Sequence, residues 1–108
     1  MNINGFARGL MARNCTEERF LIHVATCVEQ QLQEWDAQFE VMVMKLKEYE
    51  IFVKYGDDDY HLRISEEDVS TLQKTGPYHL DQKIWRELEN QGLKILEGFG
   101  NYLDTVLN

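Results

Sequence analysis

The stretch LIHVATCVEQQLQEWDAQFEVMVMKLKEYEIFV, residues 21–53, decides how this chain folds. Its apolar residues recur in alternating steps of four and three, at Leu21, Ala25, Val28, Leu32, Trp35, Phe39, Met42, Leu46, Tyr49 and Val53. No Gly or Pro interrupts the series. Because this spacing keeps one stripe of a helix facing a partner, it predicts a long amphipathic helix that organises the rest of the chain.

The end of this helix is open to two interpretations. The segment Phe39–Leu46 continues the stripe in phase, but it also alternates as a strand does. We favour a continuous helix that begins near Cys15, because only Asp36 hints at a turn after Trp35 and two valines cost a helix little. The alternative is a helix that ends near Trp35 and is followed by a three-stranded meander, which suits the usual length of helices better.

A β-hairpin is predicted further along the chain. Tyr49–Tyr55 and Tyr60–Ile64 are rich in β-branched and aromatic residues, and the polar segment Gly56–Asp59 separates them. In the second strand Leu62 and Ile64 alternate with His61 and Arg63. One face of that strand should therefore be buried and the other should meet water.

The C-terminal part predicts two or three helices. Ser65 begins a capping-box pattern, which places a short helix from Glu66 to about Gln73. Helical spacing resumes over Leu80–Gln91, and Gly92 is typical of a left-handed helix stop. Residues 93–107 are expected to form a terminal helix that starts loosely, since two glycines weaken it.

These elements amount to one α+β, helix-dominated domain. It consists of the long N-terminal amphipathic helix, an antiparallel hairpin that extends to a three-stranded meander in the second interpretation, and the C-terminal helices. A chain of 108 residues has room for a single core, which we assign to residues 15–108. Residues 1–14 keep neither helical nor strand period and are expected to be an arm, flexible or docked.

Charge and composition narrow the classes of function. Nineteen acidic against eleven basic residues give a net charge of −8, which disfavours binding to nucleic acid or to an anionic membrane surface. The chain has no leader-like start and no long apolar run, so we expect a soluble cytoplasmic protein. Six acidic residues fall in one segment and predict an acidic surface: Asp57, Asp58, Asp59, Glu66, Glu67 and Asp68.

The residues that could carry chemistry are few. His23 and Cys27 are four apart and share a helix face, which is the spacing of two metal ligands on one helix. Cys15 lies at a helix start, where the helix dipole stabilises a thiolate. Paired CxxC or HxxxH motifs, phosphate-binding glycine loops and nucleophile elbows are absent from the sequence. We therefore interpret Cys27 as a packed thiol and expect no cofactor, no metal and no enzymatic activity.

The sequence thus favours a small, acidic, non-enzymatic interaction or regulatory protein. It would bind another protein, or a second copy of itself, through the part of the helical stripe that the other elements leave uncovered. That part is expected around Leu32, Trp35, Phe39 and Met42. The six acidic residues are a second candidate surface, and neither a membrane nor a small-molecule substrate is inferred.

Three alternatives stay open at this point. The acidic segment could act as a decoy that occupies a nucleic-acid-binding protein. Helices beside a hairpin are also found in winged-helix DNA-binding modules, although the helix at 80–91 offers only Lys83 and Arg86 for phosphates. The third alternative is a small Cys/His metal or enzyme domain built on His23 and the two cysteines.

Overall fold

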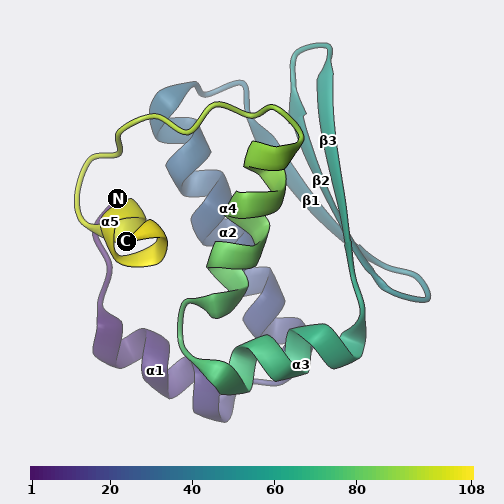
Figure 1. The fold of residues 1–108 in the computed structure, drawn as a ribbon, viewed down its shortest axis with the longest axis vertical. Coiled ribbons are helices and arrows are strands. Elements are labelled where there is room, and N and C mark those ends of the chain that lie inside the picture. Colours follow the sequence, from purple (N-terminus) through teal and green to yellow (C-terminus); the bar gives the residue numbers. More distant parts are fainter.

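The computed structural model describes residues 1–108 and confirms the predicted α+β, helix-dominated fold class. Two N-terminal helices precede a three-stranded antiparallel meander, and three helices follow it (Figure 1). In chain order the elements are α1 Gly5–Asn14, α2 Glu17–Trp35, β1 Glu40–Lys45, β2 Tyr49–Tyr55, β3 Asp58–Ile64, α3 Glu66–Thr75, α4 His79–Asn90 and α5 Tyr102–Leu107.

The favoured continuous helix through Leu46 is wrong, and the alternative of a helix ending near Trp35 is correct. Asp36 provides the physical reason. Its carboxylate accepts a hydrogen bond from the backbone N–H of Gln38 at 2.9 Å and another from the Tyr55 hydroxyl at 2.6 Å. The first bond forms a local turn that competes with the helix, and the second ties that turn to β2.

The sheet has the strand order β1-β2-β3, and a two-residue turn joins β2 to β3. Gly56 begins this turn with a positive φ of 59°, a conformation that favours glycine. The connection is shorter than the four residues predicted, because the strands extend to Tyr55 and Asp58. Leu62 and Ile64 are buried while His61 and Arg63 are exposed, as the alternation predicted.

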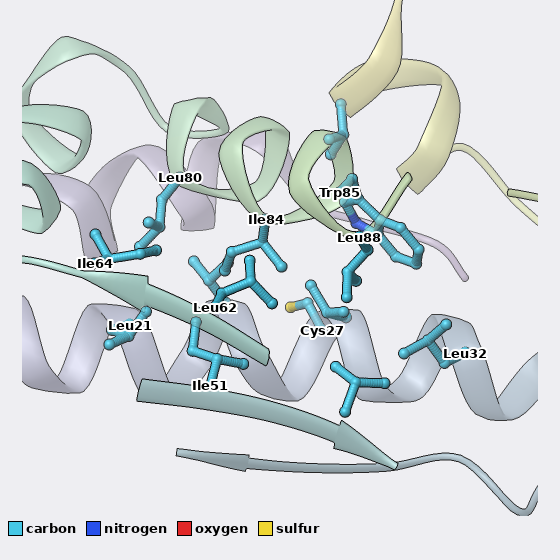
Figure 2. Packing of buried hydrophobic residues seen from close by; sticks show 14 of the residues in the cluster. Leu21, Cys27, Leu32, Ile51, Leu62, Ile64, Leu80, Ile84, Trp85 and Leu88 are labelled. Carbon is cyan, nitrogen blue, oxygen red and sulfur yellow. The ribbon is translucent and has the colours of Figure 1, made fainter. Parts of the chain in front are cut away.

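All the helices lie on one side of the sheet (Figure 1). Helix α2 packs on β1, α4 packs on β3, and the two helices contact each other. Between them and the sheet lies one continuous core, in which apolar side chains of α2, α4 and the strands converge (Figure 2). The opposite face of the sheet has no helix on it, so the molecule is a two-layer α/β sandwich with one open face.

The caps predicted for the C-terminal helices are confirmed. The Ser65 hydroxyl accepts a hydrogen bond from the N–H of Asp68 at 3.0 Å and begins α3. Gly92 takes a φ of 100° after α4, and the N–H of Leu93 bonds the carbonyl of Leu88 at 3.0 Å. The terminal helix is shorter than predicted. Only residues 102–107 are helical, and residues 93–101 form an irregular segment.

The N-terminal arm is a docked helix. Asn4 caps α1 by accepting a hydrogen bond from the N–H of Ala7 at 3.1 Å. The residues before α1 lie beside the start of α5, where the N–H of Tyr102 bonds the carbonyl of Met1 at 3.1 Å. None of the helices is both long enough and apolar enough to span a membrane.

Candidate functional site

The stripe residues predicted to bind a partner are mostly inside the molecule. Leu32 is fully buried and Phe39 is 8% exposed, since both contribute to the core. Trp35 is half-buried, and its indole N–H donates to the carbonyl of Glu97 at 2.9 Å. Met42 alone among the four is exposed, at 45%, and it points away from the helices on the open face of the sheet.

The open face is built from alternate residues of the three strands. The register aligns Met42 of β1, Phe52 of β2 and His61 of β3 in a row across the sheet. Met44 adds a second exposed methionine beside this row. A shallow hollow of about 370 Å³ lies over this centre and is lined by Met42, Met44, Phe52, Lys54, Asp59 and His61.

Side-chain contacts hold the aromatic part of this face in place. The rings of Phe52 and His61 stack with centroids 4.4 Å apart and planes 3° from parallel. The Glu50 carboxylate lies 2.8 Å from the His61 ring nitrogen and accepts a hydrogen bond from Arg63 Nε at 3.2 Å. These contacts cover Glu50, which is only 8% exposed although it lies on the open side. Contacts within the chain therefore hold these side chains in one arrangement.

Both edges of the sheet are partly capped by glutamate or glutamine side chains. At the β1 edge, the Glu29 carboxylate accepts the N–H of Val41 at 2.9 Å. At the β3 edge, Gln91 accepts the N–H of His61 at 3.0 Å and donates to the His61 carbonyl at 2.6 Å. Such caps occupy the backbone groups through which a sheet adds a further strand.

The acidic segment does not form one patch. Its six residues are all exposed, but Asp57–Asp59 lie at the β2–β3 turn and Glu66–Asp68 at the start of α3. These two groups are at opposite ends of β3, a seven-residue strand that spans about 20 Å. Glu66 is also paired with Lys45, so part of the second group is neutralised.

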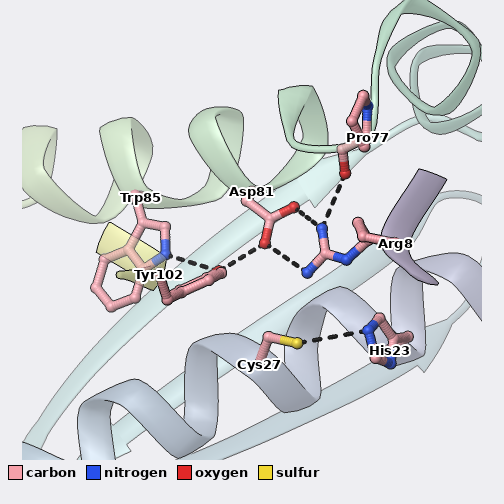
Figure 3. Close-up of polar contacts among 7 residues, drawn as sticks. All are labelled: Arg8, His23, Cys27, Pro77, Asp81, Trp85 and Tyr102. Carbon is pink, nitrogen blue, oxygen red and sulfur yellow. Dashed lines mark hydrogen bonds and ion pairs between the residues drawn. The ribbon is translucent and has the colours of Figure 1, made fainter. Parts of the chain in front are cut away.

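A second polar constellation is buried in the helical layer (Figure 3). Arg8 of α1 makes a bidentate ion pair with Asp81 of α4, with one N–H···O distance of 3.0 Å, and also donates to the carbonyl of Pro77 at 2.9 Å. The Tyr102 hydroxyl donates to Asp81 at 2.6 Å and accepts from Trp85 at 3.2 Å. Burial and the adjacent Asp81 charge hold the pKa of Tyr102 well above its usual value. The cluster connects α1, α4 and α5.

The His23–Cys27 pair predicted from spacing is present on α2, with 3.6 Å between Cys27 Sγ and His23 Nε2. It lines a cavity of about 250 Å³ together with Arg8 and Tyr78. Burial raises the pKa of Cys27, while burial and the charge of Arg8 lower the pKa of His23. Both shifts favour a neutral thiol beside a neutral imidazole, whereas a nucleophilic thiolate needs the opposite.

No group of three or more His, Cys, Asp or Glu side chains is placed to hold a metal ion. Cys15 is half-buried at the junction of α1 and α2, separate from the His23–Cys27 pair, and its carbonyl accepts from Gln73 at 2.8 Å.

Sequence reasoning missed three residues of the open face: Met44, Phe52 and His61. A signal was available, because both Val41 and Val43 and the alternate Met42 and Met44 are apolar. A strand that is apolar on both faces needs a cover on each side. In a meander whose helices all pack on one side, that pattern indicates an uncovered apolar surface.

Comparison with known proteins adds no family assignment. No protein-family model, no curated protein and no solved structure matches this chain.

Proposed function

We propose that this chain is a non-enzymatic protein-interaction module that binds its partner through the open face of the sheet. The observation that carries the proposal is the exposed apolar centre of that face, formed by Met42, Met44 and Phe52 with His61. Contiguous apolar surface with a polar rim is typical of protein-binding sites. The contact would therefore be made by strands and not by the helical stripe that the sequence favoured.

The chemistry of the face supports a protein partner. Methionine side chains are flexible and polarisable, so they adapt to an opposing apolar surface. Phe52 and His61 provide a flat and rigid platform beside them, because their rings are stacked. Charged residues surround this centre at both ends of the strands, which is the arrangement of a polar rim.

The alternatives draw less support from the geometry. The acidic residues that a decoy would use are divided between two ends of β3. On α4, Arg86 is engaged by Glu89 and by the carbonyl of Leu107, which leaves Lys83 as the exposed cation that a DNA-binding helix would use. The His23–Cys27 pair favours its neutral form, which does not suit nucleophilic catalysis.

Site-specific photo-cross-linking tests the proposal directly. A benzophenone amino acid placed at Met44 should form covalent adducts with the partner in the cells that make this protein. The same group placed at Phe6, a 75% exposed residue of α1, serves as the matched control. We expect adducts from Met44 only, and we expect Met42→Lys in the same chain to abolish them because it puts a charge in the apolar centre.

Two results would contradict the proposal. One is adduct formation at Phe6 equal to that at Met44, which would indicate non-specific contact. The other is adduct formation at Met44 that Met42→Lys leaves unchanged, because the contact would then not depend on the apolar centre.

A further inference from the structure

We propose that the partner of the open face is a second copy of this chain, packed sheet against sheet about a two-fold axis that runs along the row Met42, Phe52 and His61. This inference rests on the proposed function, since it names the partner of the same surface. It is carried by the order of charges along β2 and β3.

The charges flank the central row with opposite signs. On β2, Glu50 and Lys54 lie two residues before and after Phe52. On β3, Asp59 and Arg63 lie two residues before and after His61. All four side chains share the open face with the central row, because alternate residues of a strand point to the same side.

A two-fold rotation about the central row exchanges the two ends of every strand. Lys54 of one copy then faces Glu50 of the other, and Asp59 of one copy faces Arg63 of the other. The rotation repeats each contact, so the interface contains two exposed Asp59–Arg63 pairs, and each Lys54 lies over a Glu50 carboxylate that His61 and Arg63 partly cover. Each residue on the axis, Met42, Phe52 or His61, faces the same residue of the other copy.

A two-fold axis that runs parallel to the strands is disfavoured by the charges. It would place Lys54 against Lys54 and Glu50 against Glu50. It would also bring β1 over β3, so that Glu40 faces Asp59. Like charges held opposite each other oppose association, so the charge pattern favours the axis along the central row over the axis parallel to the strands.

Packing distances are compatible with this arrangement. Two sheets stacked face to face lie about 10 Å apart, which the long side chains of Lys54 and Arg63 can span. The capped edges of the sheet leave the face as the more available surface for self-association. Three short strands offer a small contact area, and interfaces below about 1,200 Å² are typical of weak and transient complexes. The dimer should therefore form and dissociate with concentration.

A charge-swap pair tests the register of this dimer. In a dimer of the Asp59→Arg variant, the new arginine faces Arg63 of the other copy at both contacts. In a dimer of the Arg63→Asp variant, the new aspartate faces Asp59 of the other copy. Sedimentation velocity from micromolar to millimolar concentration should show a monomer–dimer equilibrium for the native chain and dimers weakened by about tenfold or more for each variant. An equimolar mixture of the two variants should regain native affinity, because each contact then joins an arginine to an aspartate.

Three different results would contradict the proposed dimer or its axis. A native chain that stays monomeric at millimolar concentration would overturn the dimer, as would single variants that dimerise like the native chain. A mixture no tighter than either variant would overturn the proposed axis. Circular dichroism of each variant checks that it is folded, and the control Phe6→Lys should leave association unchanged.

Failure of self-association can be distinguished from failure of the interaction surface. Cross-links from Met44 to a different protein, combined with a monomeric native chain, would retain the interaction surface and remove self-association. Cross-links to the same chain are expected if both proposals hold. Site-independent cross-linking would remove the interaction surface itself.

Discussion

At the level of single residues, the Arg8–Asp81 ion pair is the buried salt bridge that joins α1 to α4. Arg8 is 4% exposed and Asp81 is fully buried, so each charge has lost its water and relies on the other. Burial opposes the charge of Arg8, but the hydrogen bond and charge of Asp81 outweigh this effect and raise the pKa of the guanidinium. Removing one partner leaves an uncompensated buried charge.

Asp81→Asn should therefore lower the free energy of unfolding by about 3–5 kcal/mol, measured by urea denaturation. Asp104→Asn, at an exposed position in the first turn of α5, is the matched control and should stay within about 0.5 kcal/mol of the native chain. Adding Arg8→Met to Asp81→Asn should recover part of the loss, because the unpaired charge is gone. An effect of Asp81→Asn as small as that of the control would contradict this account.

Sequence reasoning had no access to this pair. Arg8 and Asp81 are 73 positions apart, and Arg8 lies in a segment without helical or strand period. Asp81 is in the first turn of a helix, where an acidic residue is already favoured by the dipole. Each residue has a sufficient local interpretation, so only the tertiary fold reveals the pair.

At the level of elements, Gln91 protects the outer edge of β3. Its side chain bonds both backbone groups of His61 that point away from β2. Gln91→Ala should remove these two hydrogen bonds, each with a net contribution of about 0.5–1.5 kcal/mol. In amide hydrogen exchange followed by NMR, the His61 amide should then exchange several-fold faster.

The neighbouring amide of Leu62 provides an internal reference, because alternate N–H groups of an antiparallel strand point to opposite sides and this one faces β2. Gln82→Ala, on the same helix, is the matched control variant, since no hydrogen bond of its side chain is present. Equal acceleration at His61 in both variants would show that α4 as a whole has loosened and that the edge contact is not specific.

Elements with local signals were predictable, and elements that depend on distant contacts were not. The Ser65 cap and the Gly92 stop act within one turn of their helices, and both were predicted. The end of α2 depends partly on Tyr55, which reaches Asp36 from β2, nineteen residues away. Without that contact the stripe of apolar residues runs on in phase, so the continuous helix was the favoured but incorrect prediction.

At the level of the whole molecule, the fold packs its helices on one face of the sheet and leaves the other face uncovered, and we propose that this second face binds a partner. Leu32 of α2 and Phe39, just before β1, belong to the core that covers the first face, and Met42 of β1 lies on the second face. Their heptad spacing could not separate them, because it contains no information on which side of a strand a residue lies. Strand register decides which residues are neighbours across the open face. Sequence spacing alone does not determine that register.

We propose that the open face of the sheet is where this chain binds its own copy. Amide chemical shifts of the isotope-labelled native chain, followed through a dilution series, locate the surface that self-associates. We predict concentration-dependent shifts confined to the strands and largest around Met42, Phe52 and His61, with the helices α1 and α5 unaffected. Shifts centred on the helices, or no shifts up to millimolar concentration, would contradict the claim.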